Sequence, residues 1–234
     1  MVPPFTSRPT HPHLSYQGTI DYEFIVLDTV RGAQICQLSA ITKSENCLSE
    51  YTHPACNISQ KASLINGLSI KTINGKITLL KDNNPILSIS LAQCLENFAK
   101  FISNGESNFH IVLIGHNSTT FETLTLLRSG GLTFKQLHSS WNLFFADILH
   151  LIRALIKAGN VSLQIDEKAC KPNLSAEFET VFQRKCDAHD ALEYVRALHM
   201  ILFDSALNLT IAQTLNNSKS CSMLSLTCSS WMIA

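Results

Sequence analysis

Two apolar runs, each followed closely by polar side chains, place the strongest constraint on how this chain folds. Residues 22–27 (YEFIVL) lead into Asp28, and residues 109–114 (FHIVLI) are followed, after one glycine, by His116 and Asn117. Short continuous apolar runs of this length are typical of strands that are buried on both faces of a sheet. Such strands need helices on both sides, so the pattern predicts an α/β fold.

Further strands are expected beside these two. Residues 33–41 follow the first run so closely that the two predict an antiparallel hairpin. Residues 143–149 predict a fourth core strand or the junction between a strand and the helix that follows. Residues 68–80 contain Asn74-Gly75, a turn signal that joins two short strands. These segments predict a central mixed β-sheet.

Helices are expected to flank this sheet. Leu91, Leu95, Phe98 and Ile102 recur at the spacing of an amphipathic helix. Further helices are predicted over residues 118–128, from residue 149 to residue 157 and from about residue 188 to residue 203. Residues 42–66 are polar and predict irregular structure.

The length and composition favour one domain. The chain has 234 residues, of which 45% are hydrophobic, which is enough for one core. We expect a flexible N-terminal lead over residues 1–20, a folded domain over residues 21–205 and a Ser- and Asn-rich tail of uncertain order over residues 206–234.

Charge and targeting signals exclude several classes of protein. Lys and Arg number 18 and Asp and Glu also number 18, which excludes a binder that holds nucleic acid by bulk positive charge. Residues 1–20 lack the apolar run of a secretory signal, and no run is long enough to span a membrane. We therefore expect an intracellular protein, in the cytoplasm or nucleus, with no membrane partner. In such a compartment we expect the eight cysteines to be reduced thiols and not disulfides. No pair of them has the spacing of a zinc ribbon.

Three polar clusters lie at the ends of buried elements. Asp28 closes the first strand, His116, Asn117 and Glu122 follow the strand of residues 109–114, and His189 and Asp190 open the last helix. Carboxylates and histidines in such positions are typical of metal-dependent phosphodiesterases.

These clusters, in this order, resemble the motifs of the DEDDh family of 3′–5′ exonucleases, the DnaQ and ribonuclease T group with a ribonuclease-H-like fold. The segments that carry the resemblance are YEFIVLDT, IVLIGHNSTTFETLTLL, FFADIL and KCDAHDALEYVRAL, within residues 20–205. The resemblance implies a domain that acts on the 3′ end of single-stranded DNA or RNA through Mg²⁺ or Mn²⁺.

The family motif also assigns roles to individual residues. In the family, four carboxylates hold two divalent cations and a histidine takes a proton from the attacking water. By this resemblance Asp28 and Glu122 are metal ligands, His189 is the general base, and His116 and Asn117 support the site. Asp190 and Tyr194 are further supporting positions.

Two positions lack a carboxylate that the family pattern has, and Glu122 replaces an aspartate but keeps its charge. Val30 stands where the first motif has a glutamate, and Tyr194 stands where the third motif has its aspartate. Two of the four carboxylates are therefore missing, and Mg²⁺ tolerates few missing ligands. We expect at most one divalent-cation site, with hydrolytic activity weak or absent.

Several simpler interpretations stay open. Asp28 can be a turn residue at a strand end, Glu122 can favour a helix dipole, and His189 can be a surface histidine at a helix start. Tyr194 can pack against the sheet or stack on a base. The departures also fit a non-catalytic module that binds RNA or a protein in the cleft, or an altered coding sequence.

Overall fold

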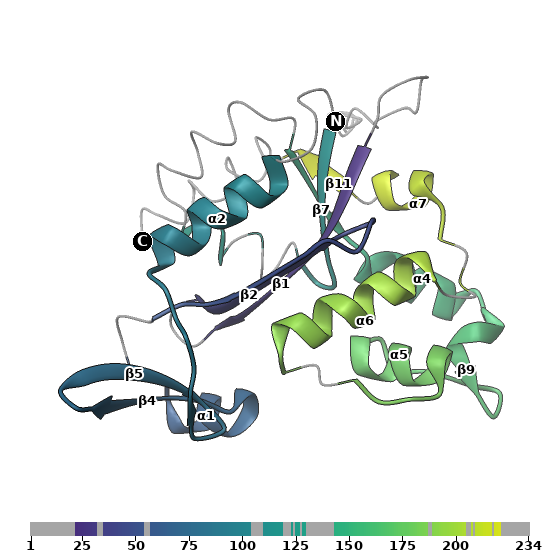
Figure 1. The fold of residues 1–234 in the computed structure, drawn as a ribbon. Helices are drawn as coiled ribbons and strands as arrows, with labels where there is room; N and C mark the ends of the chain where they lie inside the picture. Colours follow the sequence, from purple (N-terminus) through teal and green to yellow (C-terminus); the bar gives the residue numbers. More distant parts are fainter. Residues whose placement is uncertain are drawn as a thin grey trace, which may run out of the picture.

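A six-stranded mixed sheet forms the centre of the computed structural model (Figure 1). The strand order is β11-β8-β7-β1-β2-β3. Strands β1, β7 and β8 run parallel to one another, and the remaining neighbours are antiparallel. The strands are β1 (Tyr22–Arg31), β2 (Ile35–Thr42), β3 (Cys47–Tyr51), β7 (His110–Gly115), β8 (Leu143–Asp147) and β11 (Ser218–Ser220).

The structure describes most of the region expected to fold. The described residues are 22–31, 35–53, 57–103, 110–118, 123, 125–126, 128–129, 143–186, 189–204, 207, 209–216 and 218–220. For residues 22–24, 26–31, 211 and 218–220 only the backbone is described.

The four core strands and the first hairpin that the sequence predicts are confirmed. β1 pairs with β2 in antiparallel register, with Ile25 opposite Thr42. β7 and β8 are buried along nearly their whole length. Along β7, Val112 contributes to one core cluster and Leu113 to the other, so side chains alternate between the two faces. This explains why the strands are continuously apolar.

Helices cover both faces of the sheet, as expected for an α/β fold. On one face, α2 (Leu91–Ser103) buries Leu95, Phe98 and Ile102, which confirms the predicted amphipathic helix. The other face carries a larger helical layer (Figure 1). This layer consists of α4 (Leu149–Lys157), α5 (Leu174–Phe182), α6 (Ala191–Phe203) and α7 (Ile211–Asn216), with the short elements η1 (Val161–Leu163), β9 (Gln164–Ile165) and β10 (Lys168–Ala169) beside them. The helices predicted to end at residues 157 and 203 are confirmed.

A small separate sheet lies between β3 and α2 in the chain, and we call residues 57–90 the insert. It contains α1 (Gln60–Asn66) and the three strands β4 (Leu68–Ile73), β5 (Lys76–Lys81) and β6 (Asn84–Pro85). The predicted Asn74-Gly75 turn is confirmed, since both residues have positive φ, 51° and 76°.

The prediction of irregular structure over residues 42–66 is wrong. β3 and α1 both lie in this segment. α1 is short, and its apolar side chains are exposed, so no stripe of buried residues marks it in the sequence. Ser59 caps its start by accepting from Ala62 N, and Gly67, with φ 69°, ends it.

Folded structure continues beyond residue 205. α7 follows this boundary, and β11 pairs with β8 at the edge of the main sheet. Leu207 and Leu215 are buried in the core cluster between the main sheet and the larger helical layer. The burial of these two leucines favours packing of this segment on the domain despite its polar composition.

Candidate functional site

The parallel strands bring the expected polar residues to one edge of the sheet. Val26 of β1 pairs with Ile114 of β7, so Asp28 lies just past the end of that pairing. Gly115, one residue before His116, pairs with Asp147 at the end of β8. The carboxyl ends of all three strands therefore meet, which is the usual position of a ligand site in an α/β sheet.

The turn after β7 is hydrogen-bonded to the end of β8. Asn117 N donates to Asp147 Oδ1 at 2.9 Å, and Ser118 Oγ donates to the Ala146 carbonyl at 2.9 Å. Asp147 is buried and also accepts from Leu149 N at 3.0 Å, so one carboxylate orders both the turn and the start of α4. Asn117 has φ 69°, a conformation that asparagine tolerates better than most residues.

His116 is buried against an acid that the sequence did not suggest as a site residue. Its Nε2 lies 3.0 Å from Glu177 Oε1 on α5, and the Glu177 side chain is fully buried. The other oxygen, Glu177 Oε2, has no hydrogen-bond partner among the described residues. The pair ties α5 to the end of β7, and His116 therefore has a structural partner rather than an open position in a cleft.

Tyr194 also reaches the end of β7. Its hydroxyl donates to the His116 carbonyl at 3.2 Å. This residue occupies the position at which the family motif has a metal-binding aspartate. A phenol that donates to a carbonyl adds no negative charge to the edge of the sheet, so it does not replace the missing carboxylate.

Asp190 joins the start of α6 to β3 and β5. Its Oδ1 caps the helix by accepting from Leu192 N and Glu193 N, at 2.9 and 3.3 Å. Its Oδ2 accepts from the Tyr51 hydroxyl at 3.1 Å and lies 3.6 Å from Lys81 Nζ of β5. Asp190 is thus a cap and an ion-pair partner.

The charge balance around Asp190 favours its ionised form. Burial alone raises the pKa of this carboxyl, but the backbone donors of α6, Lys81 and Tyr51 together lower the pKa below its ordinary value of 3.8. Burial, reinforced by the negative charge of Asp190, raises the pKa of Tyr51 to about 12. Tyr51 therefore stays protonated and keeps its donor at neutral pH.

The start of α6 also lies against the end of β1. Ala191 N donates to the buried side chain of Gln37 at 3.1 Å, and Gln37 pairs across the hairpin with Val30. Val30 is two residues past Asp28. The backbone of β1 near Val30, in the segment that resembles the first family motif, therefore lies close to the start of α6, in the segment that resembles the third.

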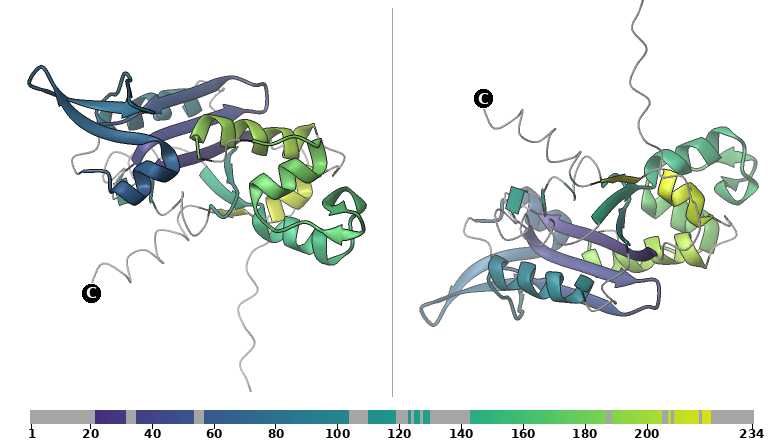
Figure 2. Two further views of the ribbon diagram at one scale, coloured as in Figure 1. Left: turned by 90° about the horizontal axis from the view of Figure 1, so that it is seen from below. Right: turned by 90° about the horizontal axis from the view of Figure 1, so that it is seen from above.

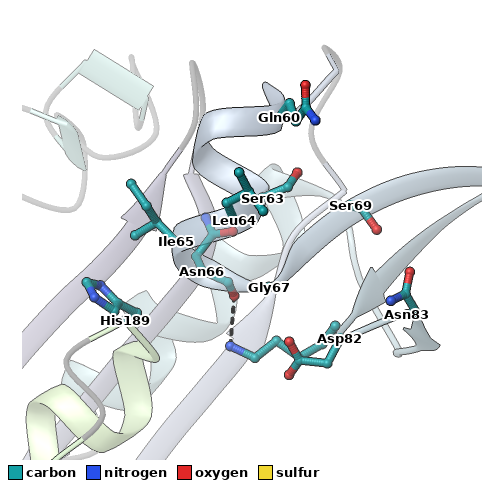
Figure 3. Close-up of a pocket in the computed structure, with 11 residues that line it drawn as sticks. Gln60, Ser63, Leu64, Ile65, Asn66, Gly67, Ser69, Asp82, Asn83 and His189 are labelled. Atoms are coloured by element: carbon teal, nitrogen blue, oxygen red, sulfur yellow. Dashed lines mark hydrogen bonds between the residues drawn. The ribbon is translucent and has the colours of Figure 1, made fainter.

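His189 is exposed and lines a cavity of about 380 Å³ between the start of α6 and the insert. Figure 3 shows its ring beside Ile65 of α1, with Asp82 and Asn83 across the cavity. Leu64 and Ile65 line the cavity, and they are 80% and 52% exposed. The cavity thus offers an imidazole, apolar surface and amide or carboxylate groups from the insert.

The metal site expected from the resemblance is tested only in part. The side chain of Asp28 and all of Glu122 lie outside the described residues, so their assignment as ligands stays a prediction. Among the residues that the structure does describe, no group of three or more His, Cys, Asp or Glu side chains could hold a metal ion. With Val30 and Tyr194 in place of two acids, the residues present do not fit a two-metal site.

Sequence reasoning missed several residues that shape this region. Glu177, Lys81 and Gln37 all contact an expected site residue or its neighbour. A charged residue in the apolar stripe of α5 is the signal that marks Glu177. No local pattern marks Lys81 or Gln37, because their partners at the start of α6 are more than 100 residues away in the chain.

The fold is similar to that of E. coli exonuclease I. A zinc-bound complex of that protein with single-stranded DNA matches with a TM-score of 0.58 at 15% identity, over 78% of this chain and 40% of that one. A complex with a dT13 oligonucleotide has a TM-score of 0.59 at 15% identity over the same shares, and the apo form has 0.58 at 14% identity, over 78% and 41%.

The likeness fits a ribonuclease-H-like fold. This chain spans about two fifths of the length of exonuclease I. No family model and no curated protein sequence matches the chain. In addition, none of the helices in the described part of the chain is long and apolar enough to cross a membrane.

Proposed function

We propose that this chain binds the 3′ end of single-stranded DNA or RNA in the cavity at His189 and that its hydrolytic activity is weak or absent. The observation that carries the proposal is the position of this cavity. It lies where α6, whose start is packed beside the end of β1, meets the apolar side chains of α1. Apolar side chains favour contact with bases, and the fold is one on which exonuclease I is built.

The absence of two family carboxylates supports binding of nucleic acid without hydrolysis. Tyr194 donates to a carbonyl where the family motif has an acid, and Val30 removes a second acid. In this proposal Asp28 and Glu122 hold at most one Mg²⁺ or Mn²⁺, and His189 contacts the terminal nucleotide. Without the second cation, the attacking water is poorly activated.

Binding is tested with a fluorescent oligothymidylate, in Mn²⁺ and again with a chelator. We expect binding to fall several-fold in Ile65→Ser, because the apolar wall of the cavity is lost. Leu87→Ser is the matched control, since Leu87 is exposed in the same insert but does not line the cavity. Equal losses in both variants, or no binding by the unchanged protein, would contradict the proposal.

Turnover is tested with a 3′-labelled oligonucleotide in Mg²⁺ or Mn²⁺. We expect little or no release of nucleotide. Hydrolysis at a rate typical of enzymes, abolished by His189→Ala, would show instead that the remaining ligands suffice for catalysis.

The second candidate function is a non-catalytic module for RNA or for a protein partner. The same two departures, Val30 and Tyr194, favour it. Oligonucleotide binding that is unchanged by the chelator favours this function, and binding that vanishes with the cation counts against it.

A further inference from the structure

The insert carries an excess of positive charge, although the net charge of the whole chain is zero. Residues 57–90 contain four lysines, at positions 61, 71, 76 and 81, and a single acid, Asp82, whereas the whole chain has equal numbers of both signs. Lys81 is paired with Asp190. The other three lysines are exposed, and they form no salt bridge with any described residue.

Two of these lysines share one face of the β4–β5 hairpin. In the antiparallel register Lys71 is opposite Thr78, and Ile73 is opposite Lys76. Because alternate residues of a strand point to the same side, these four side chains lie on one face. Lys71, Lys76 and Ile73 are exposed, with Ile73 39% accessible. The face combines ammonium groups with an apolar side chain.

This face begins at the cavity. Ser69, which lies on the same face as Lys71 and Ile73, lines the cavity with His189. The turn residues Asp82 and Asn83 line it as well, whereas Lys81, opposite Leu68, belongs to the other face of the hairpin. The hairpin then extends away from the six-stranded sheet (Figure 2). A strand of the length of β4 spans about 20 Å, roughly the length of six stacked nucleotides.

We propose that the β4–β5 hairpin is a track for single-stranded nucleic acid, holding the strand on the 5′ side of the end that sits in the cavity. This inference rests on the proposed function and names the path of its ligand. Lys71 and Lys76 contact phosphates, and Ile73 contacts a base or sugar. An oppositely charged ligand explains the local excess of lysine, which a purely apolar contact between two copies of the chain does not.

The test compares a long and a short ligand in Lys71→Gln/Lys76→Gln. For an oligothymidylate of about 20 nucleotides, we expect Kd to rise by about tenfold at low salt. The slope of log K against log salt concentration should fall by about 1.4, because each phosphate contact contributes about 0.7 on a single strand. A trinucleotide, which fills only the cavity, should bind equally to both proteins.

Lys157→Gln/Lys168→Gln is the matched control, since both lysines are exposed outside the insert. We expect this variant to bind the long ligand with unchanged affinity and salt slope. Equal affinity and slope in the hairpin variant and the unchanged protein would overturn the track and leave the proposed function standing. Loss of trinucleotide binding in the hairpin variant would also overturn it. Failure of the unchanged protein to bind either ligand would overturn both proposals.

Measuring the oligomeric state tests whether the exposed face of the hairpin binds nucleic acid or a second copy of the chain. We expect a single species whose mass does not change in Ile73→Ser/Ile77→Ser. A dimer that this variant dissociates would show that the exposed side chains of the hairpin serve self-association, and it would overturn the track.

Discussion

Lys81 connects the end of one helix to the start of another: its Nζ lies 2.9 Å from the Asn66 carbonyl of α1 and 3.6 Å from the Asp190 carboxylate of α6. A cation is favourable at the C-terminus of a helix and an anion at the N-terminus. Lys81 therefore favours the end of α1, the Asp190 carboxylate favours the start of α6, and the ion pair between the two side chains holds the insert against the main domain. The cavity at His189 lies between these two units.

Lys81→Met should loosen the insert from the main domain. We expect a loss of roughly 1 kcal/mol in the free energy of unfolding, since a half-buried ion pair and one hydrogen bond are removed. The amides of α1 and β4 should exchange with solvent faster than those of α6, because the opening is local. Lys76→Met, an exposed lysine on the same strand, is the control. Equal protection of α1 in both variants would show that Lys81 does not hold the insert.

The stability of the protein should fall in acid because of Asp190. Its pKa is lowered in the folded state, so its contribution is fully present above the ordinary value of 3.8 and is lost as pH falls through the lower folded value. Asp190→Ser retains a capping hydroxyl but removes the charge. We expect urea unfolding at neutral pH to show a lower stability for this variant, and the gap between the two proteins to narrow as the pH falls below about 4. A gap that stays constant with pH would contradict this role of the carboxylate.

The sequence predicted four of the six strands of the main sheet and the helices α2, α4 and α6, because their signals are local. The continuous burial of β7 and the buried stripe of α2 follow from the order of residues alone. The insert was only half predicted: Asn74-Gly75 marked its hairpin, but α1 exposes Leu64 and Ile65 and so lacks a buried stripe.

The candidate site was less predictable than the fold. Motif matching placed His189 and Asp190 at the start of α6, where they lie. It could not show that Asp190 pairs with Lys81, or that His116 faces Glu177, because these contacts depend on how distant elements pack. The site therefore contains structural pairs that only the three-dimensional arrangement reveals.

The buried pair of His116 and Glu177 should show strong coupling in unfolding experiments. Removing one partner leaves a polar group buried without its partner, so Glu177→Leu and His116→Phe should each cost about 3 kcal/mol. The double variant should lose clearly less than the sum, because no unpaired group remains. Urea unfolding of the four proteins measures this coupling. Additive losses would show that the two side chains contribute independently.

Restoring the two missing acids should restore cation binding. We expect Val30→Glu/Tyr194→Asp to raise Mn²⁺ affinity by at least about tenfold in calorimetry, since even residues that merely support a metal site are worth that much. Tyr194→Phe is the matched control, because it removes the same hydrogen bond to His116 without adding a carboxylate. If the double-acid variant also hydrolyses a 3′-labelled oligonucleotide, adding His189→Ala should abolish that activity. Unchanged Mn²⁺ affinity in a correctly folded double-acid variant would mean that Asp28 and Glu122 do not form the metal-binding half-site that the family motif implies.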